Sequence, residues 1–455
     1  MNFHIVACGG SVMHQLTIQL KRLGHNVSGS DDEIFEPALS NLKTHNLLPT
    51  EMGWNAYRIN KNLDAVIVGM HAHKDNPEWL KAKELGLKIY SYPEFIYEHS
   101  KNKIRVAIAG SHGKTTITGM VMHVLKQNNK AFDFLVGAKL EGFDYSVQLS
   151  DAPIMIIEAD EYPDSQETKI PKFLFYKPHL ACISGIAWDH INIFPTVENY
   201  VLQFEKFMET MEENGNLFFN QDDKVLCELI SKFQNSKNVK FAGYAAHQHL
   251  KAENGFELMT PTKNYPVQIF GEHNFYNINA AYNICKTLGL SDDEFYNAIS
   301  SFKGAAKRLQ LIYQSDKNVF YFDFAHAPSK VKATVKAMKE LSPNRKLVAC
   351  LELHTYSSLN KDFLKEYKGC FDGVDFPIVF YSQHSFEMKR LPEVSPREIL
   401  MAFGNGELKT FNQPQQLLTF IKRITQFEKE FNLLMMTSGN FGGLKMEDVA
   451  KFLFN

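Results

Sequence analysis

The stretch from Val106 to Thr116 contains the residue types that bind a nucleoside triphosphate. Its apolar first half predicts a buried strand, and the pattern after the turn predicts the start of a helix. Backbone N–H groups in such a turn converge on phosphate where glycine permits close approach, and the positive end of the helix dipole faces the anion. Lys114 can then reach the outer phosphates, and the Thr115 hydroxyl can hold Mg2+. The predicted ATP-binding residues of the turn are Gly110, Ser111, His112, Gly113, Lys114, Thr115 and Thr116.

A chance Gly-Lys-Thr sequence in a surface turn is the alternative interpretation. The turn is two residues shorter than the standard loop, in which four residues separate the two glycines. We favour a phosphate loop because a predicted strand comes directly before the turn and a predicted helix directly after it. The sequence therefore predicts that this chain uses ATP.

Two further segments carry side chains that bind metal ions. Glu158 ends a predicted buried strand, and His190 follows the next predicted strand along the chain. Open α/β sheets place their ligands at the carboxyl ends of parallel strands, and Mg2+ prefers a small number of hard oxygen ligands. Glu158, His190 and the Thr115 hydroxyl are therefore the predicted Mg2+ ligands. The alternatives are a helix-capping or solvated carboxylate at Glu158 and a hydrogen-bonded structural histidine at His190.

A second glycine cluster near the N-terminus predicts a second phosphate site. Gly10 lies between the first predicted strand and a helix, and Ser30 and Asp31 end the second strand, as in a dinucleotide fold. His14 stands near the position of the missing third glycine, so a tight turn without ligand is an equal alternative. Two phosphate sites in tandem favour an enzyme that joins a nucleotide-bearing substrate to a second molecule, with ATP as the driver. A nicotinamide-dependent dehydrogenase is the weakest alternative.

Four polar residues in the second half of the chain are candidates for contact with ATP. His273 and Asn274 precede a predicted helix, where their side chains either cap the helix or bind an adenine edge. Arg308 follows a stretch of small residues and can reach the γ-phosphate, unless it is a solvated basic residue. Asp323 ends a predicted strand at the ligand edge of a third sheet.

The elements that must position these residues alternate between short apolar runs and amphipathic stretches, which predicts parallel sheets with helical crossovers. A polar stretch at 98–103 and small residues at 300–306 predict boundaries. We therefore expect an α/β protein of three consecutive domains: a Rossmann-like domain (1–102), a central P-loop ATPase-like parallel sheet (103–302) and a second Rossmann-like domain (303–455). The predicted strands include Phe3–Ala7, Asn26–Ser30, Asp64–Gly69, Ile154–Glu158, Leu180–Ser184, Val319–Phe324, Lys346–Leu351, Pro377–Tyr381 and Leu433–Thr437, and the predicted helices include Met13–Leu23 and Ile278–Leu288.

Bulk properties are typical of an enzyme with small-molecule substrates. The chain has 455 residues, which suggests about three domains, and a formal net charge of −2, which does not indicate nucleic-acid binding. Its six cysteines are scattered, mostly in apolar runs, and predict buried thiols in a reducing compartment. No signal peptide or membrane-spanning run is apparent, so we expect a soluble cytoplasmic protein with no membrane or obligate protein partner.

Taken in order along the chain, these motifs resemble those of the Mur ligase family of ATP-dependent cell-wall peptide ligases. The resemblance covers nearly the whole length of the chain. It implies three domains that bind a UDP-sugar, ATP and the incoming amino acid or peptide, respectively. The matching segments are Gly110–Thr116, Glu158–Tyr162, Trp188–His190, Gly271–Asn274, Arg308 and Asp323–His326.

The resemblance also implies a mechanism in which ATP phosphorylates a carboxylate of the acceptor and an amine then displaces phosphate from the acyl phosphate. It implies catalytic roles for Lys114, Glu158, His190 and Arg308. It assigns Lys114 and Arg308 to phosphate, Thr115, Glu158 and His190 to Mg2+, His273, Asn274 and Asp323 to adenosine, and Gly10, Ser30 and Asp31 to the uridine diphosphate.

Two branches of the family use UDP-N-acetylmuramic acid as the acceptor. One adds L-alanine, and the other adds the recovered tripeptide L-alanyl-γ-D-glutamyl-meso-diaminopimelate in peptidoglycan recycling. Tyr162, the segment Trp188–Phe194 and the turn Ser438–Gly443 are similar to the recycling branch. The segment Leu353–Ser357 is similar to the alanine-adding branch. We favour recycling and keep L-alanine as the alternative.

The chain departs from the family pattern at six positions near the predicted sites. Two of them, Ala7 and Cys8, lie in the N-terminal glycine cluster, where the family often has Gly and Ile. Gly185 and Ala187 stand where the family usually has Asn and Glu, Phe322 replaces an Asp, and Lys307 replaces an Arg. Gly185, Ala187 and Phe322 keep a non-catalytic UDP-sugar sensor open as an alternative. A folylpolyglutamate-type ligase shares the central fold but would lack an N-terminal domain of this kind.

Overall fold

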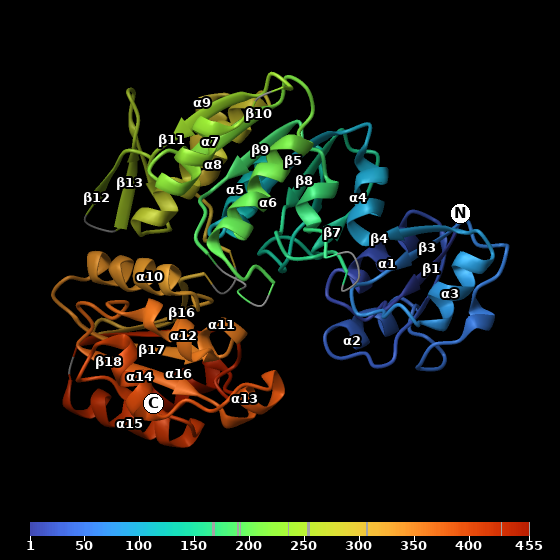
Figure 1. Ribbon diagram of the computed structural model, residues 1–455. Coiled ribbons are helices and arrows are strands. Elements are labelled where there is room, and N and C mark those ends of the chain that lie inside the picture. Colours follow the sequence, from blue (N-terminus) through green and yellow to red (C-terminus); the bar gives the residue numbers. More distant parts are fainter. Residues whose placement is uncertain are drawn as a thin grey trace. The chain divides into compact units, whose positions relative to one another are not determined.

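The computed structural model describes residues 1–165, 169–188, 191, 193–234, 236–252, 255–305, 308–428 and 430–454 (Figure 1). The chain forms two compact units. Unit 1 consists of Met1–Ile186, Val201–Ala245 and Ala280–Ala298, and unit 2 consists of Ala187–Tyr200, Ala246–Asn279 and Ile299–Asn455. Within the described ranges, no helix combines the length and the apolar character needed to cross a lipid bilayer.

The N-terminal part of unit 1 is a four-stranded parallel sheet in the order β2-β1-β3-β4. Its helices connect parallel neighbours, so the turns that follow β1 and β2 lie at the same carboxyl edge. The elements are β1 (Asn2–Val6), α1 (Met13–Arg22), β2 (Asn26–Ser30), α2 (Ala38–Thr44), η1 (Ala56–Arg58), β3 (Ala65–Val68), α3 (Pro77–Glu84), β4 (Lys88–Ser91) and α4 (Tyr92–Ser100).

A seven-stranded sheet in the order β11-β10-β9-β5-β8-β6-β7 forms the rest of unit 1. It is parallel except for β7, which pairs antiparallel with β6. Strand β5 lies at the middle of this sheet, and its run Val106–Ala109 is completely buried, as expected for a parallel strand covered on both faces. The elements are β5 (Ile104–Ala109), α5 (Lys114–Gln127), β6 (Asp133–Leu135), β7 (Val147–Gln148), β8 (Ile154–Glu158), η2 (Lys172–Phe175), β9 (Leu180–Ile183), α6 (Val197–Thr210), β10 (Asn216–Asn220), α7 (Lys224–Lys232), β11 (Lys240–Tyr244), α8 (Glu272–Thr287) and α9 (Asp292–Ile299). Helices α6 and α8 begin in unit 2, and α9 ends there.

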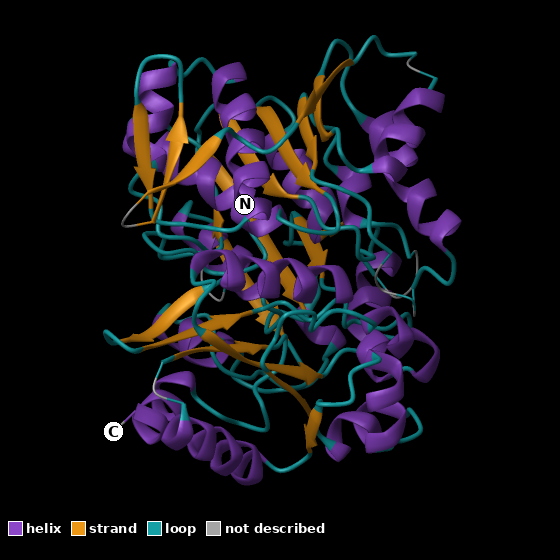
Figure 2. Cartoon of the chain, turned by 90° about the vertical axis from the view of Figure 1, so that its left-hand side faces the viewer, coloured by secondary structure: helices purple, strands orange, loops and turns teal. Residues whose placement is uncertain are grey.

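The C-terminal sheet, in unit 2, has six strands in the order β15-β16-β20-β17-β18-β19. It is parallel except for the edge strand β15, which pairs antiparallel with β16. Figure 2 shows helices on both faces of this sheet. The elements are β15 (Gln310–Gln314), β16 (Asn318–Asp323), α10 (Pro328–Leu341), β17 (Lys346–Leu353), α11 (Tyr356–Leu359), α12 (Lys361–Leu364), η3 (Lys365–Tyr367), β18 (Phe376–Tyr381), α13 (Gln383–Lys389), α14 (Pro396–Phe403), β19 (Lys409–Phe411), α15 (Pro414–Phe427), β20 (Phe431–Met436) and α16 (Met446–Phe454).

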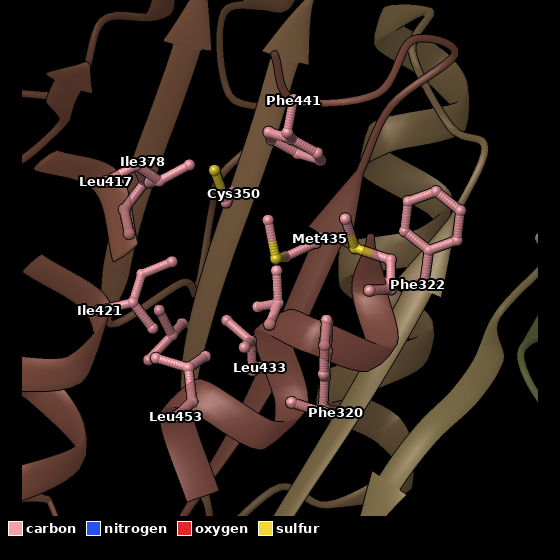
Figure 3. Close-up of a cluster of buried hydrophobic side chains, with 14 of the residues drawn as sticks. Phe320, Phe322, Cys350, Ile378, Leu417, Ile421, Leu433, Met435, Phe441 and Leu453 are labelled. Carbon is pink, nitrogen blue, oxygen red and sulfur yellow. The ribbon is translucent and has the colours of Figure 1, made fainter. Parts of the chain in front are cut away.

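Alternation along the C-terminal strands builds the core of this sheet. Leu433 and Met435 point to the same face because successive side chains of a strand alternate. On that face they pack against Leu417 and Ile421 of α15 and Leu453 of α16 (Figure 3). The apolar stripes of α15 and α16 therefore fix the sheet whose carboxyl edge carries Asp323.

The predicted fold class is confirmed, because each large sheet is an α/β arrangement dominated by parallel strands. Two features differ from the sequence-based expectation. Helix α8 begins at Glu272 and not at residue 278, so His273 and Asn274 lie in its first turn, directly after Gly271 with its φ of +89°. A small antiparallel sheet of β12 (His249–Ala252), β13 (Gly255–Met259) and β14 (Asn264–Val267) was not expected, because its strands are short and rich in polar residues. The domain boundaries near residues 102 and 302 stay predictions.

Candidate active site

The predicted phosphate loop joins the carboxyl end of β5 to the N-terminus of α5, which begins at Lys114 as expected. Gly110 has a φ of +117°, and a Cβ at this position would lie 2.8 Å from the backbone nitrogen of Ser184. Gly113 is the left-handed N-cap of α5, with a φ of +75°. Both glycines are therefore required by the backbone geometry of the turn.

A second loop, residues 184–186 after the neighbouring strand β9, forms hydrogen bonds with the phosphate loop and is here called the supporting loop. The backbone N–H of Ser111 donates to the carbonyl of Gly185 over 2.9 Å. The Ser184 hydroxyl donates to the carbonyl oxygen of His112 and, over 3.2 Å, to that of Ala109. The phosphate loop is therefore fixed by hydrogen bonds to residues 184–185, which the sequence analysis did not assign to the site.

Asp223 in turn anchors this supporting loop. One carboxylate oxygen of Asp223 accepts from the backbone N–H of Ile186 over 2.7 Å, and the other accepts from the N–H of Leu226 over 2.9 Å and caps α7. A Cβ at Gly185 would lie 2.8 Å from the Asp223 carboxylate. Asp223 was not identified from the sequence, because only the fold brings α7 beside the loop after β9.

Lys114 forms an ion pair that the sequence analysis did not anticipate. Its ammonium donates to the Glu161 carboxylate over 2.6 Å and to the carbonyl of Gly110 over 2.7 Å. Burial lowers the pKa of Lys114, but the nearby carboxylates of Glu161, Asp160 and Glu158 raise it more, so its pKa lies above the ordinary value. Lys114 is thus a permanently charged group at the N-terminus of α5, where an outer phosphate binds in loops of this kind.

Thr115 and Glu158, both predicted Mg2+ ligands, lie together. The Thr115 hydroxyl donates to Glu158 over 2.6 Å, and the second carboxylate oxygen of Glu158 accepts from the N–H of Gly137 over 2.8 Å. A hydroxyl and a carboxylate are hard oxygen donors, and Mg2+ is typically held by one or two carboxylates together with substrate phosphates. These two residues therefore fit Mg2+. His190 lies outside the described residues, and among the described residues no three His, Cys, Asp or Glu side chains form a metal-binding group by themselves.

Residues 158–161, at the carboxyl end of β8, form an acidic strand end. Its remaining carboxylate, Asp160, pairs with a second buried lysine. Lys172, at the start of η2, donates to Asp160 over 2.8 Å. Its ammonium lies 5.5 Å from the centre of the Tyr162 ring. Burial lowers the pKa of Lys172, but Asp160 raises it more, so this side chain is also charged. Glu158, Asp160 and Glu161 therefore contact three different partners, Thr115, Lys172 and Lys114.

The N-terminal glycine turn is held by Asp31. The carboxylate of Asp31 accepts from the backbone N–H of Gly9 over 2.6 Å, and burial raises its pKa to about 6. Gly10 lies in the same turn, and its carbonyl contacts the His14 ring over 2.8 Å. The Ser30 hydroxyl is completely buried and donates to Glu78, so it is occupied within the protein in this structure.

The other residues assigned to ATP belong to unit 2. The carboxylate of Asp323 accepts from the N–H groups of Leu309, over 2.6 Å, and Ala325, over 2.7 Å. Burial raises its pKa, and Arg308 opposes this rise. The Asn274 amide donates to the carbonyl of Phe270 over 2.8 Å. For His273, in the same helical turn, burial lowers the pKa to about 4.

Comparisons with known proteins identify the family. The Mur ligase family catalytic domain matches residues 2–104, and the Mur ligase middle domain matches residues 108–285. The UDP-N-acetylmuramate–L-alanine ligase of Caldicellulosiruptor saccharolyticus is 31% identical over 80% of this chain and 80% of its own length. The chain belongs to the Mur ligase family. It is accordingly an ATP-dependent ligase.

Other Mur ligases match this chain over nearly its full length. The UDP-N-acetylmuramate–L-alanyl-γ-D-glutamyl-meso-2,6-diaminoheptandioate ligase of Haemophilus influenzae is 26% identical, with 99% of both chains covered. The crystal structure of a murein peptide ligase from Psychrobacter arcticus 273-4 has a TM-score of 0.68 at 22% identity, and covers 100% of this chain and 99% of that chain. The structural likeness shows that the fold is that of a Mur ligase.

The structure gives physical reasons for two of the departures from the Mur ligase pattern. Gly185 adopts a φ of +145° beside the Asp223 carboxylate, so a side chain at this position would be strained. Phe322 is buried in the core cluster of the C-terminal sheet (Figure 3), where an aspartate would be an uncompensated charge. Lys307 lies outside the described residues, and nothing in the structure explains Ala187.

Proposed function

We propose that this Mur ligase joins UDP-N-acetylmuramate to the tripeptide L-alanyl-γ-D-glutamyl-meso-diaminopimelate, at the expense of ATP, in peptidoglycan recycling. The observation that carries the proposal is the arrangement at the carboxyl ends of β5 and β8, with Lys114 paired to Glu161 and Thr115 bonded to Glu158. This arrangement provides a cation for the outer phosphates and two oxygen donors for Mg2+ beside them. The Haemophilus influenzae relative supports the choice of substrates.

The proposed reaction begins with attack of the acceptor carboxylate on the γ-phosphate of ATP. A carboxylate oxygen forms a bond to the γ-phosphorus while the bond to the β–γ bridging oxygen breaks, which gives an acyl phosphate and ADP. The amine of the tripeptide then attacks the acyl carbon, loses a proton, and releases inorganic phosphate as the amide forms. Both steps need positive charge against developing negative charge, and Lys114 and Arg308 are proposed to supply it.

Mg2+ would be held by Thr115, Glu158 and His190, and would neutralise phosphate charge. His273, Asn274 and Asp323 are proposed to bind adenosine, and Gly10, Ser30 and Asp31 the uridine diphosphate. We assign residues 1–102 to the UDP-sugar, 103–302 to ATP and 303–455 to the incoming peptide. A cytoplasmic location is proposed because ATP and UDP-sugars are cytoplasmic metabolites.

L-Alanine is the second candidate for the incoming amine. The 31% identical Caldicellulosiruptor relative and the segment Leu353–Ser357 favour it. The turn Ser438–Gly443 favours the tripeptide. The two segments lie together in unit 2, because a Cβ at Gly439 would lie 2.7 Å from the His354 ring. Glu352, which precedes the first segment, accepts from the N–H of Phe441 over 2.8 Å. The amine is therefore proposed to be selected where β17 and β20 end.

Phosphate release tests the proposal directly. The protein is incubated with ATP, Mg2+ and UDP-N-acetylmuramate, and either the tripeptide or L-alanine is added. The proposal expects phosphate release that depends on the tripeptide, with kcat/KM at least tenfold above that for L-alanine. A higher kcat/KM for L-alanine would make L-alanine the amine in place of the tripeptide. If neither the tripeptide nor L-alanine leads to phosphate release, both candidates are contradicted.

A further inference from the structure

Lys172 is a buried cation at the carboxyl edge of the central sheet that neither the phosphate loop nor the predicted metal ligands use. Its side chain is only 13% exposed and forms an ion pair with Asp160 over 2.8 Å. Asp160 directly precedes Glu161, the partner of Lys114. A buried charge costs free energy unless it is paired, and the Asp160 side chain is itself 38% exposed, so the pair opens toward solvent on the carboxylate side.

The same ammonium also lies over an aromatic ring of the helix that follows the N-terminal sheet. It lies 5.9 Å from the ring centre of Tyr92, the first residue of α4. Tyr92 directly follows Ser91, the last residue of β4, and therefore marks the carboxyl edge of the N-terminal sheet. Helix α4 packs against η2, the short helix that Lys172 begins.

Lys172 thus lies where the carboxyl edges of two parallel sheets meet within unit 1. Parallel α/β sheets bind their ligands at these edges. The edge of the central sheet carries the phosphate loop, and the edge of the N-terminal sheet carries the glycine turn assigned to the UDP-sugar. Lys172 is therefore placed to contact a substrate that is bound at both edges.

The reaction requires a cation at this point. The acceptor carboxylate and the γ-phosphate are both anionic, so their approach is opposed by electrostatic repulsion. Lys114 is held in the phosphate loop by Gly110 and Glu161, and serves the phosphate side. The carboxylate side needs a second positive charge, and Lys172 provides one beside the same acidic strand end.

We propose that Lys172 binds the carboxylate of the acceptor that ATP phosphorylates. The inference rests on the proposed function and names the group that positions the acceptor for it. Lys172 stays protonated throughout. It donates to the carboxylate while one carboxylate oxygen bonds to the γ-phosphorus and the β–γ bridging oxygen leaves with ADP.

The experiment compares UDP-N-acetylmuramate with an analogue in which the lactyl carboxylate is replaced by a carboxamide. Binding of each is measured by calorimetry in the presence of Mg2+ and a non-hydrolysable ATP analogue. Wild type is expected to bind the carboxylate form about 10- to 100-fold more tightly, the value of a charge-assisted hydrogen bond. Lys172→Met is expected to lose this discrimination, and Lys172→Arg to keep most of it, while MgADP affinity changes by less than about twofold in both.

Lys103 provides the matched control. Its side chain is 10% exposed and pairs with Asp133, so Lys103→Met removes a paired lysine of similar burial, although the Asp133 side chain is itself completely buried. Lys103 precedes β5, whereas the phosphate loop follows it, about 20 Å away along the strand. Lys103→Met is expected to lower thermal stability and to keep the discrimination between carboxylate and carboxamide.

The outcomes separate the inference from the function on which it rests. Discrimination in Lys172→Met equal to that of wild type would overturn the role of Lys172 and leave the proposed function intact. Failure of wild type to bind UDP-N-acetylmuramate at all would overturn the proposed function itself. Should Lys172→Met fail to fold, Lys172→Gln takes its place in the same comparison, with the same two outcomes.

Discussion

Substitution of Asp223 tests whether nucleotide binding by the phosphate loop depends on the supporting loop, residues 184–186. The two carboxylate oxygens of Asp223 have separate tasks: one caps α7 at Leu226, and the other accepts from Ile186. A serine at this position keeps a cap acceptor but cannot also reach the second donor. Asp223→Ser therefore removes the contact to the supporting loop, whereas Asp223→Ala removes both contacts.

The magnitudes follow from these two contacts. Loss of a helix cap costs about 1 kcal/mol, and a buried backbone N–H left without an acceptor costs about 1–3 kcal/mol. Asp223→Ser is therefore expected to lower the free energy of unfolding by about 1–3 kcal/mol, and Asp223→Ala by about 2–4 kcal/mol. Because Gly185 accepts from Ser111 in the phosphate loop, relaxation of residues 184–186 should also weaken MgADP binding, by about 5- to 30-fold.

The assay combines denaturant unfolding with calorimetric titration of MgADP. Ser395→Ala, which removes a cap of α14 in unit 2, is the control for loss of a cap alone, and should leave nucleotide affinity unchanged. Asp223→Ser with wild-type affinity for MgADP, despite lowered stability, would refute the link between Asp223 and the phosphate loop.

Three further predictions concern single side chains. Burial raises the folded-state pKa of Asp31 from 3.8 to about 6, so its contribution to stability is present below pH 3.8 and is lost as the pH rises through 6. The free energy of unfolding of Asp31→Asn should therefore rise relative to that of wild type between pH 4 and 7, and a pH-independent difference would contradict this. Glu161→Gln leaves the buried Lys114 without its carboxylate partner, so the free energy of unfolding without ligand should fall by about 1–3 kcal/mol. The increase in Tm on adding MgADP should become larger, because the nucleotide phosphate then replaces Glu161 as the partner of Lys114, and an unchanged increase in Tm would argue against this replacement. A Cβ at Gly439 would lie 2.7 Å from a ring atom of His354, which follows β17. Gly439→Ala should therefore raise KM for the incoming amine and leave MgADP affinity unchanged, and steady-state kinetics with an unaltered KM would count against an amine site there.

Local patterns in the sequence were sufficient to predict the parts of the site that lie within one segment. The apolar run before Gly110, the two glycines and the helix start at Lys114 are consecutive, and the structure has β5, a glycine turn and α5 in this order. The pairing of Thr115 with Glu158 was expected from the rule that carboxyl ends of parallel strands share an edge.

The remaining parts depend on contacts between distant segments, which leave no periodic signal in the sequence. The sequence around Asp223 indicates only a helix cap, because the hydrogen bond that Asp223 accepts from the N–H of Ile186 forms only in the folded protein. Lys172 reads as a surface lysine, and its burial beside Tyr92 arises from the packing of η2 against α4. The strands β12 to β14 are too short and too polar to be separated from loops by alternation alone.

The central claim is that the phosphate loop at Lys114 holds an ATP whose γ-phosphoryl group is transferred to a carboxylate before the amide forms. Isotope transfer measures this most directly, with UDP-N-acetylmuramate carrying 18O in both lactyl carboxylate oxygens and with ATP, Mg2+ and the tripeptide present. An acyl phosphate requires that one 18O leaves with the phosphate, so mass spectrometry should find inorganic phosphate with one 18O and the amide product with the other. Unlabelled phosphate, formed together with the amide, would contradict the claim.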